Sequence, residues 1–270
     1  MKVSIITVCY NAERTIADAM ASVGRQRFET FEVEYIVVDG GSTDGTVEII
    51  KDFAEQFHCT PTPLTFTFRW LSEKDNGMYD ALNKGIRMAT GDVIGILNAD
   101  DVLAEENTLA KVAAAFADPS IDGTYADIRF VKDDLDAKDA NVATEISAPA
   151  RPYGPGAELI SVAVLDNAAP NVDLRQARRA VWTQSSLAQN SDLCVKKLRA
   201  LPTVRYCSGK WFRPWMFRFG TQTAHPSTFF RKECFAKWGE YSLDYGMYGD
   251  FELLCRFIWK NRARMKYLPI

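Results

Sequence analysis

The sequence predicts an α/β protein built on a mostly parallel sheet with helices packed against it. Short apolar runs typical of strands alternate with stretches whose apolar residues recur at helical spacing. Polar residues directly follow several of these runs, as expected where parallel strands end at one edge of a sheet. The chain has 270 residues, of which 47% are hydrophobic, so it can bury a substantial core.

The first half of the chain alternates regularly. An apolar run at residues 3–9 predicts a strand, and a helix is expected from residue 11 to the glycine at position 24. Further strands are expected at residues 33–38, 64–71, 92–97 and 123–131. Helices are expected after the glycine-rich turn at residues 39–45 and over residues 78–88. Because strands and helices alternate, the strands are expected to pair in parallel.

The pattern breaks after the strand at residues 123–131. Residues of about 132–206 combine an acidic run with a stretch rich in proline and glycine. We expect one domain over residues 1–270, with this segment inserted into it as a mainly helical or irregular excursion. Beyond it, a strand is expected at residues 224–230 and helices at residues 232–238 and 247–259.

Composition excludes several classes of function. A formal net charge of -3 gives no general attraction to nucleic acid, so no nucleic-acid partner is expected. The six cysteines are scattered without a C-x-x-C pair, which is typical of reduced thiols in a cytosolic protein. No signal peptide and no run of about 18 apolar residues is present, so no membrane-spanning helix is expected.

The stretch GDVIGILNADD, residues 91–101, contains a buried-type strand that runs directly into Asp100 and Asp101. Two adjacent carboxylates at a strand end repel each other unless a cation lies beside them, which favours a divalent metal site. The alternative is a loop in which one of them caps the next helix. Tyr10, Asp39 and Asp75 follow three other predicted strands, so they are expected along the same edge and favour the first reading.

Neither a G-x-G-x-x-G turn nor a G-x-x-x-x-G-K-[ST] phosphate loop occurs. Five other motifs occur in order: SIITVCYNA, VVDGGSTDGT, KDNGMYDALNKG, GDVIGILNADD, and HPSTFFRKECF followed by YGDFELLCRF. In this order and spacing they resemble the inverting family-2 glycosyltransferases with the GT-A fold, over about residues 1–131 and 210–268. The resemblance implies a Rossmann-like nucleotide-diphospho-sugar transferase fold.

The resemblance also implies roles for individual residues. The nucleotide would be bound by residues from four motifs, namely Tyr10, Asp39, Gly77 and Asp100, with Tyr10 at the nucleoside, Asp39 at the edge of a uracil-type base and Asp100 at the ribose. Asp101 would hold Mn²⁺ or Mg²⁺, hard cations that prefer oxygen ligands and that stabilise a leaving diphosphate.

Asp250 matches the general base of the family, which accepts the proton of the attacking hydroxyl. A structural reading, a carboxylate that merely favours the start of a helix, is the alternative. The family often has two acidic residues at this motif, and Gly249 here replaces the first. His225 and Lys84 are further candidates, His225 at the metal-diphosphate or acceptor and Lys84 as a counter-charge to the diphosphate.

The predicted function is metal-assisted transfer of a hexosyl or N-acetylhexosaminyl group, with inversion, from a UDP-type sugar donor to a saccharide or lipid-linked acceptor. The product would be a bacterial-type cell-surface polysaccharide. Residues 210–219 (KWFRPWMFRF) mix aromatic and cationic side chains, which favours contact with the inner face of a membrane, although a buried aromatic cluster is equally consistent. A catalytically silent binding module and a sugar nucleotidyltransferase are the alternative functions.

Overall fold

The computed structural model describes residues 1–28, 30–59, 66–131 and 203–269. The chain divides into two compact units, residues 1–128 with 207–270, and residues 129–206. Most of the expected insertion lies outside the described residues, so the single domain over residues 1–270 and its insertion at about 132–206 stay predictions. The described ends of the second unit, β6 (Ile128–Val131) and β7 (Thr203–Cys207), pair in a two-stranded sheet.

The first unit contains a seven-stranded sheet in the order β3-β2-β1-β4-β8-β5-β9. Four parallel strands form one side of it, namely β1 (Lys2–Cys9), β2 (Glu32–Asp39), β3 (Phe66–Ser72) and β4 (Val93–Ile96). β8 (Phe229–Arg231) is antiparallel to both β4 and β5 (Gly123–Ala126), and β9 (Met265–Leu268) runs parallel to β5. The prediction of a mostly parallel sheet is therefore confirmed.

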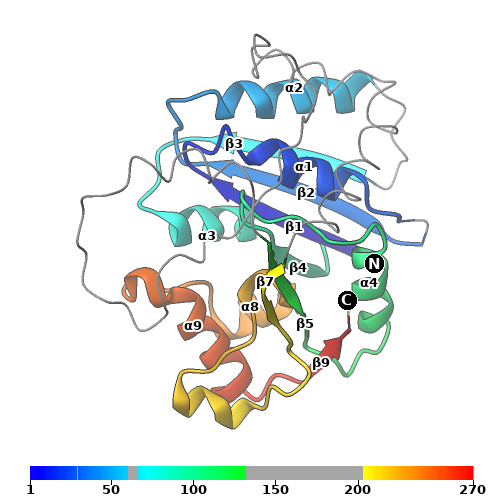
Figure 1. Cartoon of the computed structure of the whole chain (residues 1–270), viewed down its shortest axis with the longest axis vertical. Helices are drawn as coiled ribbons and strands as arrows, with labels where there is room; N and C mark the ends of the chain where they lie inside the picture. Colours follow the sequence, from blue (N-terminus) through cyan, green and yellow to red (C-terminus); the bar gives the residue numbers. More distant parts are fainter. Residues whose placement is uncertain (29, 60–65, 132–202, 270) are drawn as a thin grey trace. The chain divides into compact units, whose positions relative to one another are not determined.

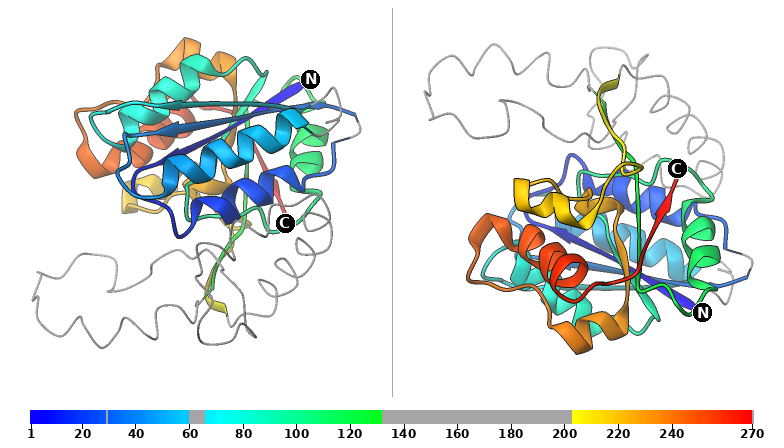
Figure 2. Two further views of the ribbon diagram at one scale, coloured as in Figure 1. Left: turned by 90° about the horizontal axis from the view of Figure 1, so that it is seen from above. Right: turned by 90° about the horizontal axis from the view of Figure 1, so that it is seen from below.

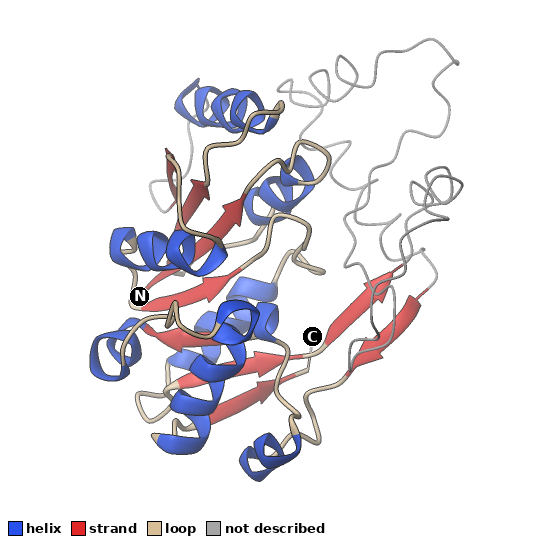
Figure 3. Cartoon of the chain, turned by 90° about the vertical axis from the view of Figure 1, so that its left-hand side faces the viewer, coloured by secondary structure: helices blue, strands red, loops and turns tan. Residues whose placement is uncertain are grey.

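Helices cover both faces of this sheet (Figures 1, 2 and 3). One face carries α1 (Ile16–Gly24) and α2 (Thr46–Cys59), where the ring of Tyr35 meets that of Phe53. The other face carries α3 (Met78–Met88), α8 (Lys232–Trp238) and α9 (Gly249–Leu254). There Ile6 and Ile36 share a core with Leu82, because alternate residues of a strand point to opposite faces. A further helix, α4 (Thr108–Phe116), precedes β5.

Two predicted elements differ from the structure in their bounds. The strand expected at residues 224–230 is shorter, because the 3-10 helix η2 (His225–Ser227) precedes β8. The hydroxyls of Ser227 and Thr228 both donate to the carbonyl of Ala224 (2.9 Å each), a local bond that competes with strand pairing. The strand expected at residues 123–131 divides into β5 and β6, and the side chain of Asp127 between them accepts from the N–H of Gly209 and the hydroxyl of Tyr267.

The helix expected at residues 247–259 is three successive helical segments. The 3-10 turn η3 (Gly246–Tyr248) leads into α9, which continues as the π-helical η4 (Cys255–Lys260). The edge strand β9 was not expected, because Leu268 is its one buried residue and the segment carries no apolar period.

Candidate active site

The carboxyl ends of three strands meet at one edge of the sheet. Cys9 at the end of β1 pairs with Asp39 at the end of β2, which pairs with Ser72 at the end of β3. Tyr10 follows directly and is 64% exposed, so its ring is free to meet a ligand. Beyond Ser72, a short loop reaches Gly77, which has a φ of 106° and is the N-cap residue of α3. This edge is where parallel α/β sheets bind ligands.

Asp39 is buried and surrounded by hydrogen-bond donors. Its Oδ2 accepts from the N–H groups of Gly41 (3.1 Å) and Ser42 (3.0 Å) and from the hydroxyl of Ser72 (2.7 Å), and its Oδ1 accepts from the hydroxyl of Ser42. Burial by itself raises the pKa of Asp39, but these donors outweigh it and leave the pKa below its usual value. Asp39 thus fixes the loop after β2, and its contact with a base stays a prediction.

Asp75 lies in the loop after β3, at the edge where the sequence places it without giving it a specific role. Its Oδ1 accepts from the N–H of Gly77 (2.9 Å), and its Oδ2 lies against Gly40, where an added Cβ would be 2.5 Å away. Among the described residues no donor bonds to Oδ2, so this atom is open to a ligand. The sequence predicts the place of Asp75 at this edge, whereas its approach to Gly40 depends on the tertiary structure.

Asp100 and Asp101 lie just beyond the end of β4, as expected. The amide of Asn98 donates to Asp101 Oδ2 at 2.8 Å. Burial and then the charge of Asp100 raise the pKa of Asp101 to about 7, which the Asn98 amide only partly offsets. A divalent cation would offset both the burial and the repulsion that raise this pKa, so the pair fits such an ion.

The donor set at Asp101 also fits a particular kind of metal site. The described part of the chain contains no group of three or more histidine, cysteine or acidic side chains that could hold a metal ion. Mg²⁺ is commonly bound by one or two carboxylates together with substrate phosphates and waters, and the pair Asp100 and Asp101 offers that number. Their roles as nucleotide and metal ligands stay predictions.

Asp250 lies at the start of α9 and contacts α3. The hydroxyl of Tyr79 lies 3.3 Å from Asp250 Oδ1, and it accepts from the N–H of Asp250 at 3.1 Å. The amide Nε2 of Gln222 lies 3.5 Å from Oδ2. Because Tyr79 is in the first turn of α3, directly after the loop of Asp75 and Gly77, this contact ties the start of α9 to the ligand-binding edge of the sheet.

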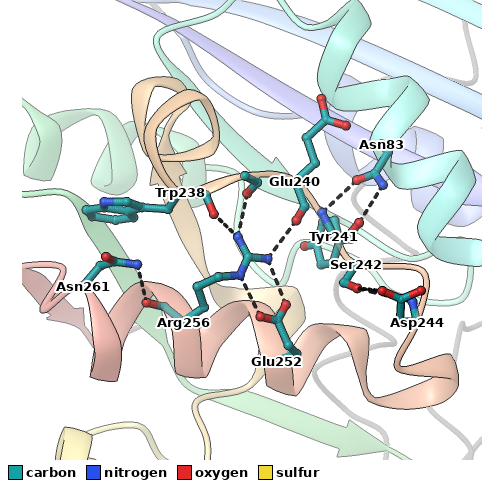
Figure 4. A network of polar contacts seen from close by, with 10 residues as sticks. Asn83, Trp238, Glu240, Tyr241, Ser242, Asp244, Glu252, Arg256 and Asn261 are labelled. Atoms are coloured by element: carbon teal, nitrogen blue, oxygen red, sulfur yellow. Dashed lines mark hydrogen bonds and ion pairs between the residues drawn. The ribbon is translucent and has the colours of Figure 1, made fainter.

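The chain before α9 is held by the Arg256 guanidinium (Figure 4). It pairs with Glu252 at 2.7 and 2.9 Å and donates to the carbonyls of Trp238, Gly239 (3.0 Å) and Glu240 (2.8 Å). A guanidinium with five donors in a fixed plane suits such a junction, which a lysine could not reproduce. The path of the chain into residue 241 is therefore anchored by Arg256 on η4, the continuation of α9, and by its ion pair with Glu252 on α9.

His225 and Lys84, the two further candidate site residues, both contact other side chains of the chain. His225 Nε2 lies 2.5 Å from the hydroxyl of Tyr241. Burial lowers the pKa of His225, against the opposing charge of Asp250, so the ring is neutral near pH 7. Lys84 Nζ pairs with Glu73 (2.8 Å) and Asp80 (3.9 Å). Contacts of either residue with a donor stay predictions.

The segment at residues 210–219 divides into buried and exposed aromatics. Phe212 and Phe217 are buried, and their rings pack edge to face at 5.3 Å. Trp211, Trp215 and Phe219 are 71%, 54% and 77% exposed, the last two on the 3-10 helix η1 (Pro214–Phe219). A buried aromatic cluster is therefore present at Phe212 and Phe217, whereas membrane contact of the exposed side chains stays a prediction.

Two solved glycosyltransferases share this fold. Residues 1–349 of TarS from S. aureus match with a TM-score of 0.54 at 19% identity, covering 99% of this chain and 58% of that one. The mannosyltransferase PcManGT from Pyrobaculum calidifontis, solved with GDP-Man and Mn²⁺, matches with a TM-score of 0.56 at 18% identity, covering 99% and 54%. The fold is therefore the GT-A glycosyltransferase fold that the sequence predicts.

Comparison of the sequence with family models identifies the family of this chain. The family model described as glycosyl transferase family 2 matches residues 4–163, and the chain belongs to this family. A PGL/p-HBAD biosynthesis glycosyltransferase of Mycobacterium bovis is 38% identical over 127 residues, which cover 46% of each chain. An uncharacterized glycosyltransferase of Mycoplasma pneumoniae is 35% identical over 115 residues, covering 42% of this chain and 36% of the relative. The chain thus spans about half the length of the curated relatives it matches.

Proposed function

We propose that the protein transfers a sugar from a nucleoside-diphosphate donor to a hydroxyl of a saccharide or lipid-linked acceptor, with inversion at the anomeric carbon. The observation that carries this proposal is the contact of Tyr79 with Asp250, which links the candidate base to the loop of Asp75 and Gly77. Family membership supports the transfer of a sugar. TarS, solved with UDP, supports a uridine donor of hexosyl or N-acetylhexosaminyl type as the first choice to test.

The proposed roles follow the chemistry of each position. Tyr10, Gly77 and Asp75 would surround the nucleoside, and Asp100 would face the ribose. Mn²⁺ or Mg²⁺ held by Asp101 would stabilise the charge that grows on the diphosphate as it leaves. PcManGT, a protein with this fold, was solved with Mn²⁺, which supports testing that ion first.

Asp250 would accept the proton of the acceptor hydroxyl as the new glycosidic bond forms. The carbon–oxygen bond to the diphosphate breaks at the same time, and the leaving group keeps the electron pair. Since base and leaving group lie on opposite sides of the anomeric carbon, the configuration inverts. A positioned general base contributes typically about 10²- to 10⁴-fold in rate.

We also propose that the reaction takes place at a membrane surface, on the cytoplasmic side. The support is the exposure of Trp211, Trp215 and Phe219 next to cations, with Lys210 over the Trp211 ring at 5.5 Å and Arg218 over the Trp259 ring at 5.2 Å. Such a mixture suits the interface of an anionic membrane. No described helix is long and apolar enough to cross a bilayer.

The test is a panel of UDP- and GDP-sugars incubated with Mn²⁺, in which release of the nucleoside diphosphate is measured. Asp250→Asn should lower turnover at least about 100-fold while donor affinity changes little, because the amide keeps the shape of the carboxylate but cannot accept the proton. Asp244→Asn, an exposed aspartate in the preceding loop, is the control. Retained configuration in the product, or activity of Asp250→Asn within about threefold of the unmodified protein, would contradict the proposal.

A further inference from the structure

The Tyr79 hydroxyl contacts both the side chain and the main chain of Asp250. Its hydroxyl oxygen accepts from the N–H of Asp250 at 3.1 Å, and its single proton has two possible acceptors, Asp250 Oδ1 at 3.3 Å and the carbonyl of Met247 at 3.1 Å. One phenol therefore fixes where the helix begins and which way the carboxylate faces. The two residues are 171 positions apart in the chain.

Gly249 makes this approach possible. A Cβ added there would lie 2.8, 2.9 and 3.0 Å from three ring atoms of Tyr79, closer than carbon atoms pack. The ring of Tyr79 thus occupies the space of a side chain at position 249. This accounts for the glycine at a position where the family often has an acidic residue.

The two oxygens of the Asp250 carboxylate have different surroundings. Oδ1 accepts from the N–H of Phe251 at 2.7 Å and lies near Tyr79. Oδ2 has, among the described residues, only the long 3.5 Å contact with Gln222. The Oε1 of Gln222 is buried and has no hydrogen-bond partner in the described part of the chain. Oδ2 is therefore the oxygen free to receive a proton, next to an unpaired acceptor that could bind a hydroxyl group.

Contacts with Tyr241 fix the position of the Tyr79 ring. The ring of Tyr241 stacks on it with centroids 5.5 Å apart, and the Tyr241 hydroxyl bonds to His225. The backbone of Tyr241 pairs with the side chain of Asn83 on α3, at 2.8 and 2.9 Å (Figure 4). Burial raises the pKa of Tyr79 to about 12, so the phenol keeps its proton near pH 7.

We propose that Tyr79 is a positioning residue for the proton acceptor Asp250, and that Gly249 is needed to admit its ring. The proposal rests on the proposed function, in which Asp250 is the base. Before transfer, Tyr79 donates to Oδ1 and turns Oδ2 toward the acceptor hydroxyl. When Oδ2 has taken that proton, the carboxyl group is neutral, and the phenol proton turns to the carbonyl of Met247. No proton leaves Tyr79 in this sequence.

Tyr79→Phe tests the proposal because it removes the hydroxyl and keeps the ring. With UDP-glucose and UDP-N-acetylglucosamine as probes, and UDP release as the signal, kcat should fall on the order of 10- to 100-fold, since a small misplacement of a catalytic group has costs of that size. The donor KM should stay within about twofold, because Tyr79 acts on the base and not on the nucleotide. Tyr267→Phe, which removes a phenol bonded to Asp127 at 2.7 Å, should leave kcat unchanged.

A double-mutant cycle separates this proposal from the assignment of Asp250. In Asp250→Asn, adding Tyr79→Phe should lower kcat by no more than about twofold, because the group that Tyr79 positions no longer accepts a proton. Gly249→Ala should lower kcat as Tyr79→Phe does, with the fold checked by circular dichroism. If Asp250→Asn is inactive but Tyr79→Phe keeps kcat within about twofold, or if the two losses add, Tyr79 is not a positioning residue. If Asp250→Asn stays active, the proposed base is wrong.

Discussion

The carboxylate of Asp75 occupies the space beside Gly40, with Oδ2 2.5 Å from the position of an added Cβ. Asp75 comes from the loop after β3, and Gly40 directly follows β2. The absence of a side chain at position 40 lets a carboxylate from the next strand end reach this point. Asp39, the adjacent residue in the chain, instead accepts hydrogen bonds from the loop that follows it and from the Ser72 hydroxyl at the end of β3.

We therefore expect Asp75 to contribute more to nucleotide binding than Asp39. Asp75→Ala should weaken UDP binding about 10- to 100-fold, the range for a hydrogen bond to a charged group. The N3–H of uracil can donate to a carboxylate and cytosine has no such proton, so the preference for UDP over CDP should also shrink. Calorimetry with both nucleotides measures this.

Glu73→Gln changes an exposed carboxylate of the same loop and serves as the control for Asp75. Asp39→Asn should lower the thermal midpoint of unfolding. The UDP affinity of the folded protein should fall less in Asp39→Asn than in Asp75→Ala. If Asp75→Ala binds UDP as tightly as the unmodified protein, the base does not contact Asp75.

Metal-linked nucleotide binding is expected at Asp101. Asp101→Asn should abolish the increase in UDP affinity that Mn²⁺ gives, because a neutral amide is a poorer ligand for a hard cation than a carboxylate. Titrating UDP with Mn²⁺ and then with EDTA measures the increase. Asp92→Asn, at the opposite end of β4, should behave like the unmodified protein. Equal affinity for UDP with and without Mn²⁺ in the unmodified protein would rule out the metal role.

Membrane contact is expected of the exposed aromatics in residues 210–219. Trp215→Ser with Phe219→Ser should reduce flotation with anionic liposomes. Binding should weaken as salt rises, because salt screens the lysine and arginine charges of residues 210–219. Phe212→Ser should lower stability, since Phe212 is buried against Tyr125 and Phe217. Flotation that is unchanged in the Trp215 and Phe219 double variant would contradict the proposal.

Protonation of Glu34 at low pH should lower the free energy of unfolding. Its side chain is buried, and burial raises its pKa, but hydrogen bonds from Ser4 (2.6 Å), the Thr90 N–H (2.7 Å) and Arg69 (3.3 Å) leave the pKa below the usual value. A lowered pKa in the folded state gives stability that is present above the unfolded pKa, near 4.3, and is lost as pH falls through the folded value.

Glu34→Gln should therefore lower the free energy of unfolding at pH 7 by about 1–3 kcal/mol, and the difference from the unmodified protein should shrink below about pH 4. Urea unfolding at pH 7, 5 and 3.5 measures both. Glu32→Gln, an exposed residue of the same strand, is the control. A difference that stays constant over this pH range would show that the charge of Glu34 is not the cause.

Much of the fold could be predicted because its first half consists of local patterns. The apolar run of β1 and the helical period of α3 each lie within one short window, and the bounds of α3 match the prediction. Asp100 and Asp101 were found at a strand end for the same reason, since a buried run followed at once by two carboxylates is visible in the sequence alone.

The sequence by itself determined the alternation of strands and helices, the family motifs and the polar residues that end each parallel strand. Only the tertiary structure decided which oxygens are open to ligands, which aromatics of residues 210–219 are exposed, and that Tyr79 and Asp250 meet. The physical reason is distance along the chain. A periodic pattern constrains neighbours within one element, whereas a contact across 171 positions depends on how the loops and both faces of the sheet bring α3 and α9 together.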